Sequence, residues 1–378
     1  MRIIDRYLLR QFFKAFMICF FSLTGLYIVF HAFTNLEDFM KCGEKGGGLA
    51  RLMIPFYAYQ SILFFEHTSA LLTLIAAMFT ITWLQRYNEL TALMSAGVSR
   101  IRVVTPIICA AIVLSVLGTV NRELVIPRIR GHLGRTPSDV FGDSTQDLSS
   151  KVDEQTDIII SGKAGNRKKM RIESADFRLP IALSSYGRDL VAGSAEYRPP
   201  ENGRPGGYLL RGVTEPKELA TKPSLVLGGK KILLTPLDRP EWLKANECFV
   251  VSNLEFDQLI GDQMFRDNAS TAELIKGLRN SSLEYGADVR VAIHSRIVRP
   301  VLDITLLFLG LPLVVSRQTR NIFYSMGLCL ALVVLFLLLQ LGFQYLGANS
   351  VIIPALAAWI PLMISVPTAV ALAHSMWQ

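Results

Sequence analysis

The chain has 378 residues, of which 51% are apolar and only 19% are charged, and its formal net charge is +8. This balance excludes an ordinary soluble domain and indicates a membrane protein.

Long apolar stretches fill the first 120 and the last 80 residues, and a polar block separates them. The last two stretches carry no charge, and each exceeds the roughly 20 residues that cross a bilayer as a helix. Prolines inside the stretches do not argue against helix, because neighbouring helices can satisfy the freed carbonyls. We therefore expect six membrane spans in two groups of three: 15–33, 68–84, 103–120, 300–316, 322–346 and 351–373.

Lys and Arg residues in short loops set the orientation of a membrane protein. With the N-terminus inside, nine basic residues are inner and three are outer, so both termini are expected to be cytoplasmic and the polar block outside. A cleaved signal peptide is disfavoured, because the first apolar run is too long and no small-residue cleavage site follows it. The inner residues are Arg2, Arg6, Arg10, Lys14, Arg86, Arg100, Arg102, Arg317 and Arg320, and the outer ones are Lys41, Lys45 and Arg51.

The loop between the second and third spans, 86–102, reads RYNELTALMSAGVSRIR. Leu90, Leu93 and Met94 have helical spacing, and Gly97 ends the run, so a short amphipathic helix is expected at about 86–99. Such a helix can lie at the lipid interface. It can also dock on a cytoplasmic partner, and the pattern alone favours the interface.

The polar block, about 121–270, reads as β structure. Partly alternating runs such as 157–162, 168–177, 207–212, 230–237 and 248–259 are separated by Gly- and Pro-rich turns. This pattern is typical of a sandwich or jelly roll. We expect three parts: spans 1–3 with the short helix in 1–120, a β-jellyroll-like domain in 121–270, and a connecting helix with spans 4–6 in 271–378.

Motifs for chemistry are missing from the sequence. It contains no nucleotide-binding loop, since GGK at 228–230 lacks the rest of that motif, and no H-E-x-x-H or nucleophile elbow. No metal ligand pattern, cofactor or nucleic-acid partner is expected, and the chain is interpreted as non-catalytic. Cys42 and Cys248 would both lie outside, but their spacing does not favour a disulfide.

Five segments stand out along the chain: DRYL at 5–8, NELTALMSAGVS at 88–99, ELVIP at 123–127, STAELIKGLRN at 270–280 and GLPL at 310–313. Together they resemble the LptF/LptG permease family, the membrane halves of a lipopolysaccharide exporter. The resemblance implies a subunit that extracts lipopolysaccharide, or a related anionic glycolipid, from the bacterial inner membrane. It implies a heterodimer with the other LptF/LptG permease, an LptB-type ATPase dimer that supplies the energy, and an LptC/LptA-type periplasmic bridge. The final spans favour the LptG type.

The resemblance also assigns roles to residues. In 88–99 it makes the short helix a coupling helix, with Glu89 as the polar contact and Leu90, Leu93 and Ala96 packing into the ATPase. The full expected coupling set is Glu89, Leu90, Thr91, Leu93, Ala96, Gly97 and Ser99.

Family members carry basic residues that contact lipid phosphates at the outer end of the first span. Here the corresponding position is His31, and two further basic positions fall near Glu37 and Asp38, which departs from the family pattern. Glu66 and His67 reach the same rim and are expected to cluster with His31. The expected headgroup residues are His31, Lys41, Glu66, His67, Arg122, Arg128 and Arg130.

Two other classes of membrane protein share parts of this layout. One is the permease of another lipid or lipoprotein exporter, but those place the outer domain between the first two spans. The other is a receptor or scaffold with an extracytoplasmic β domain, which has no use for a coupling helix.

Overall fold

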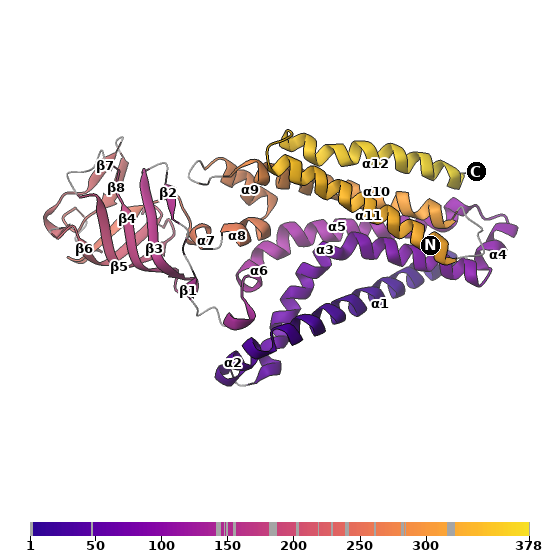
Figure 1. Ribbon diagram of the computed structural model, residues 1–378, viewed down its shortest axis with the longest axis horizontal. Coiled ribbons are helices and arrows are strands. Elements are labelled where there is room, and N and C mark those ends of the chain that lie inside the picture. The colour runs from indigo at the N-terminus through magenta and orange to yellow at the C-terminus, as the bar shows by residue number, and fades with distance from the viewer. Residues whose placement is uncertain are drawn as a thin grey trace. The chain divides into compact units, whose positions relative to one another are not determined.

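The structure is a computed structural model (Figure 1). It divides into a helical unit, Met1–Leu133 with Tyr285–Gln378, and a β unit, Gly134–Glu284. The residues described are 3–46, 48–140, 145–146, 148, 150–153, 156–180, 187–201, 204–217, 219–227, 230–238, 242–260, 262–280, 283, 285–315 and 322–377.

In the described part of the chain, six helices are long and apolar enough to cross a membrane, as predicted. They exceed the predicted spans: α3 has 38 residues, about 57 Å, which is longer than a ~30 Å hydrocarbon core. The helical unit contains α1 (Ile3–Thr34), α2 (Leu36–Gly46), α3 (Leu49–Arg86), α4 (Glu89–Ser95), α5 (Arg100–Val120), a π-helical turn (Asn121–Val125), α6 (Ile126–Leu133), α10 (Ala287–Val315), α11 (Ile322–Ala348) and α12 (Pro354–Trp377).

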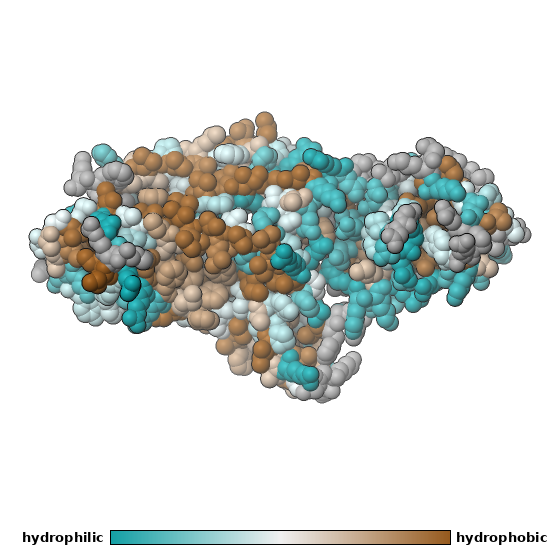
Figure 2. All heavy atoms as spheres, turned by 180° about the vertical axis from the view of Figure 1, so that it is seen from behind, coloured by the Kyte–Doolittle hydropathy of each residue, from teal (hydrophilic) through white to brown (hydrophobic). Residues whose placement is uncertain are grey.

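The core of the helical unit lies where α1, α3, α5, α10, α11 and α12 meet. Gly310, in the GLPL segment of α10, allows the closest approach there. A Cβ at this position would lie 2.5 Å from Leu74 Cδ1 and 3.0 Å from Cys329 Sγ, so glycine lets α10 pack tightly against α3 and α11. Many other large apolar side chains point outward, which suits a lipid-facing surface. Figure 2 shows these apolar residues over the helical unit and polar residues over the β unit.

The β unit is one antiparallel sheet, which confirms the predicted β domain inserted between the third and fourth spans. Strands β3, β4, β5 and β6 follow one another as a meander, and β6 then pairs with β9 and not with β7. The path is β1-β3-β4-β5-β6-β9-β8-β7, and β2 also pairs with β3. The strands are β1 (Thr145–Gln146), β2 (Lys151–Asp153), β3 (Ile158–Asn166), β4 (Arg171–Arg178), β5 (Asp189–Arg198), β6 (Gly207–Glu215), β7 (Leu225–Leu227), β8 (Lys230–Leu234) and β9 (Glu247–Val251).

Register explains the core of the sheet. Ile172 pairs with Ala195, Ala195 with Leu210, and Leu210 with Cys248, so these four fully buried side chains share one face. Burial raises the pKa of the Cys248 thiol, which is free. Tyr208 on the same face donates a hydrogen bond of 2.9 Å to the Leu254 carbonyl.

The edges of the β unit differ from the expected 121 and 270. Helical structure continues from α5 through the π-helical turn and α6 to Leu133, because Ile126 and Leu133 are buried and hold that segment on the helical unit. At the other edge, α7 (Phe256–Leu259), α8 (Asp262–Asn268) and α9 (Thr271–Leu278) belong to the β unit. A capping box begins α9, in which the Glu273 amide donates to Ser270 Oγ at 3.2 Å. Gly228 and Gly229 of the GGK segment lie outside the described residues.

Candidate functional site

The short helix α4 is delimited by two backbone features. Asn88 precedes it in the left-handed region, at φ 55°. At its end, the Val98 amide donates to the Leu93 carbonyl at 3.0 Å and the Gly97 amide donates to Met94 at 2.9 Å. This is the Schellman arrangement, and it requires the positive φ of 83° that Gly97 adopts easily. The sequence therefore encodes both ends of α4.

The apolar side of α4 packs inside the protein. Leu90 is only 8% exposed and forms a cluster with Leu8 of α1, Leu84 of α3 and Val103 of α5. Leu93, Met94 and Val98 are half-buried against that cluster. The expected coupling residues therefore separate into two groups: Leu90 supports the helix from within, whereas the exposed side chains are Thr91, Ala96 and Ser99, together with Gly97.

Polar contacts also attach α4 to the start of α1. The Tyr7 hydroxyl donates to Glu89, at 3.0 Å from Oε2 and 3.3 Å from Oε1. Two residues earlier, Asp5 accepts from Arg102 Nη2 of α5 at 3.2 Å. The contact between the DRYL segment and α4 was not predicted from the sequence. No local pattern indicates it, because 82 positions separate Tyr7 from Glu89.

At the opposite end of the long helices, His31 lies among aromatic side chains. Its Nδ1 is 3.0 Å from the Tyr57 hydroxyl, and its ring stacks on Phe56 with centroids 6.0 Å apart. Tyr57 precedes Glu66 by nine residues, about 13.5 Å along α3. The structure therefore places His31 with Tyr57, and places Glu66 in a different group.

Lys41 forms an exposed ion pair on α2, with its Nζ 2.8 Å from Glu37 Oε1. The hydrogen bond from Lys41 lowers the pKa of the Glu37 carboxyl, and the same bond raises the pKa of Lys41. Because both side chains are fully exposed, this pair is screened by solvent and contributes little to stability.

Glu66 is the centre of a buried ionic cluster. Its side chain is 2% exposed, and its carboxylate pairs with the Arg299 guanidinium of α10. Arg299 Nη2 also donates to the Glu66 carbonyl at 2.7 Å. His67 Nδ1 lies 3.2 Å from the carboxylate, and Arg122 Nη1 of the π-helical turn lies 4.0 Å from it. Glu66, His67 and Arg122 were expected at this rim, whereas Arg299 was missed.

Further polar contacts connect the same three helices. Ser115 Oγ of α5 donates to the Pro300 carbonyl at 3.4 Å and to Asp303 Oδ2 at 3.5 Å. Asn121 Nδ2 donates to the Ile62 carbonyl of α3 at 3.1 Å. The π-helical turn begins at Asn121, and such turns often occur at functional sites. The cluster marks the level at which the uncharged runs of α3, α5 and α10 end.

The two other arginines of the expected headgroup set lie on α6. Arg128 is exposed and Arg130 is half-buried. They lie six and eight residues after Arg122, so this stretch carries three cations.

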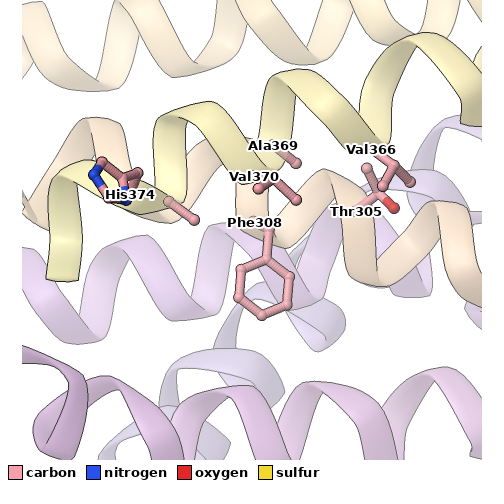
Figure 3. A pocket seen from close by; sticks show the side chains of 7 residues that line it. Thr305, Phe308, Val366, Ala369, Val370 and His374 are labelled. Carbon is pink, nitrogen blue, oxygen red and sulfur yellow. The ribbon is translucent and has the colours of Figure 1, made fainter.

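Two apolar hollows lie in the helical unit, each of about 440 Å³. One lies between α10 and α12, with His374 at one end and Thr305 at the other (Figure 3). The other lies between α1, α3 and α5 and extends to Asn121, next to the ionic cluster. Within the described residues, no group of His, Cys, Asp and Glu is arranged to hold a metal ion.

Six apolar helices with an antiparallel β domain inserted after the third define a multi-pass membrane protein. The family model described as lipopolysaccharide export system permease LptF/LptG matches residues 6–158 and 221–375. The chain therefore belongs to the LptF/LptG family, an inner-membrane permease family of the ABC system that exports lipopolysaccharide, and the resemblance seen in the sequence is confirmed. No curated protein matches the chain.

Proposed function

We propose that this chain is a non-catalytic permease subunit that extracts lipopolysaccharide, or a related anionic glycolipid, from the inner membrane. It pairs with the other LptF/LptG permease, an LptB-type ATPase dimer hydrolyses ATP for both, and the lipid passes to an LptC/LptA-type bridge. Both termini and α4 are cytoplasmic, and the β unit is periplasmic. The single observation that carries the proposal is the anchored helix α4, which presents a polar outer surface while its apolar side is buried.

Thr91 of α4, together with Ala96 and Ser99 just after it, suits contact with an ATPase, because these side chains are exposed. Leu90 and Leu93 were expected to pack into the ATPase, but we propose that they pack inside the permease instead. They join α4 to α1, α3 and α5, so a displacement of α4 is passed to three spans.

Co-purification tests this docking surface. We expect Ala96→Arg to reduce the ATPase recovered with the tagged permease by about tenfold or more, since about 1.4 kcal/mol of lost affinity gives that factor. Ala50→Arg, at an equally exposed alanine at the start of α3, serves as the matched control and should recover normal amounts. Equal recovery with both variants would remove the main support for the transporter interpretation and favour a receptor or scaffold.

Headgroup binding is proposed for the cations of the π-helical turn and α6, Arg122, Arg128 and Arg130, because arginine binds phosphate through paired N–H donors. At the position of the usual first-span cation this chain carries His31, whose ring contacts Tyr57. The proposed cations therefore lie on a later segment of the chain.

Photo-crosslinking distinguishes the two locations. A photoreactive residue at position 128 should capture glycolipid in membranes, and one at position 31 should capture less. Strong capture at position 31 with none at position 128 would contradict the assignment.

A further inference from the structure

A polar hollow of about 460 Å³ lies on the face of the β sheet opposite the main core. Its side chains come from β5, β6, β9 and the two segments before β6 and β9, so folding of the β unit alone brings them together. The residues that line it are Arg198, Arg204, Leu209, Arg211, Trp242, Lys244 and Glu247.

The floor of the hollow is apolar and rigid. Leu209 of β6 pairs with Phe249 of β9 across the sheet. Both are buried in a small cluster with Leu234 and Leu243. The Trp242 ring meets the Phe249 ring edge-on, with centroids 5.4 Å apart, which fixes the orientation of the indole.

Ion pairs hold the cations of the wall in place. Glu196 of β5 accepts from Arg198 at 2.9 Å and from Arg211 at 3.1 Å. Arg211 also reaches Glu247 at 3.5 Å, directly across the β6–β9 pair. The Arg204 guanidinium lies 5.7 Å from the Trp242 ring centroid, in cation–π geometry.

The charges of this wall are nearly balanced. Among described residues, the four cations Arg198, Arg204, Arg211 and Lys244 meet the three carboxylates Glu196, Glu201 and Glu247. The arginine side chains remain 28% to 45% exposed, so their free N–H groups can still bind a ligand. A single excess cation does not suit a polyanion such as nucleic acid.

We propose that this hollow binds a saccharide that carries one phosphate group. Forked guanidinium donors match phosphate oxygens, and the carboxylates can accept hydrogen bonds from sugar hydroxyls. Leu209 and Trp242 provide an apolar surface for the ring. The proposed function enters this inference at one point only: it identifies the natural source of the sugar as the headgroup of the transported glycolipid.

Calorimetric titration of the full-length protein in lipid nanodiscs tests the site with three probes: glucose 6-phosphate, glucose and inorganic phosphate. Glucose 6-phosphate should bind saturably and at least about tenfold more tightly than either of the others, because only it uses both the wall and the floor. The variant Arg204→Gln/Arg211→Gln should weaken binding at least about tenfold. Arg178→Gln, at an exposed arginine of β4 paired with Asp189, should change it less than twofold.

Absence of saturable sugar-phosphate binding would overturn the proposal, and so would equal binding of inorganic phosphate. Lys244→Gln provides a second variant, at an exposed lysine of the wall. Weakened binding in it supports the site even if the double variant misfolds, and unchanged binding in both variants contradicts it. Co-purification of the ATPase is measured in parallel. Normal recovery together with failed sugar binding separates this inference from the proposed function.

Discussion

Tyr7 and Glu89 connect two segments that are far apart in the sequence. The phenol of α1 donates to the carboxylate at the start of α4, while Leu8, next to Tyr7, packs on Leu90, next to Glu89. A hydrogen bond and an apolar contact therefore lie next to each other between α1 and α4. Together they hold α4 against α1, and we propose Tyr7 as the residue that positions α4.

Removal of the Tyr7 hydroxyl should weaken transmission but not ATPase docking. Tyr7→Phe keeps the ring and loses a hydrogen bond to a charged group, which contributes about 1 kcal/mol at a partly exposed site. We expect glycolipid released per ATP hydrolysed to fall about fivefold, with normal ATPase recovery. The measurement is the ratio of lipid release to phosphate release in proteoliposomes.

Tyr87→Phe is the matched control for that prediction. Tyr87 is an exposed tyrosine just after α3 whose ring lies tilted against Trp83, with centroids 4.8 Å apart. If both variants lower the ratio equally, the effect belongs to general loosening near α4, and the positioning role of Tyr7 is lost.

At the scale of elements, the buried Glu66 cluster connects the two groups of three spans. Glu66 lies on α3, Arg122 follows α5 and Arg299 lies on α10, so a single carboxylate meets both halves of the helical unit. Ionisable groups inside membrane helices are costly unless they are paired. The pair therefore fixes the relative placement of the halves.

A double-mutant cycle measures this link. Glu66→Gln and Arg299→Gln should each lower the thermal unfolding midpoint by several degrees. Arg299→Gln leaves the buried Glu66 carboxylate without its main partner, and Glu66→Gln leaves the half-buried Arg299 guanidinium without its carboxylate. The double variant should be less destabilised than the sum of the two, with a coupling of about 1 kcal/mol or more. Scanning fluorimetry in nanodiscs provides the midpoints.

The exposed pair Glu37 and Lys41 is the control cycle, with the same substitutions and no measurable coupling expected, because solvent screens the pair. Additive effects at Glu66 and Arg299 would show that the cluster does not join the halves.

Elements with a strong local signal were predictable. Long apolar runs marked all six spans, and the segment 270–280 marked α9. Strand β5 was missed, because Asp189–Arg198 contains small and charged residues and its strand character comes from pairing on both sides with β4 and β6. The helical segment after Val120 was assigned to the β domain, because its burial depends on contacts with other helices.

The candidate site was predictable only in part for the same reason. The segment of α4 has local features, namely Asn88, Gly97 and the leucine spacing, and its short helix was predicted. Arg299 lies 233 positions from Glu66, and no local sequence pattern predicts that the two side chains pair. Likewise, His31 and Glu66 looked like neighbours at one rim, but their own partners separate them.

In the whole molecule, the contacts of α4 form a path for the proposed transmission of energy. A push on α4 would reach α1 through Tyr7, α5 through Val103 and α3 through Leu84, and the Glu66 cluster would pass the motion of α3 to α10. One apolar hollow lies between α1, α3 and α5, and the other lies between α10 and α12. Under the proposed function, closure of these hollows would displace lipid.

The most direct test of this central claim is ATP-dependent release of glycolipid from proteoliposomes that contain this chain, the partner permease and the ATPase. We expect release with the wild-type chain and a loss of about tenfold or more with Ala96→Arg, which blocks docking, but not with Ala50→Arg. Glycolipid release that needs no ATP, or that is unchanged by Ala96→Arg, would contradict the account.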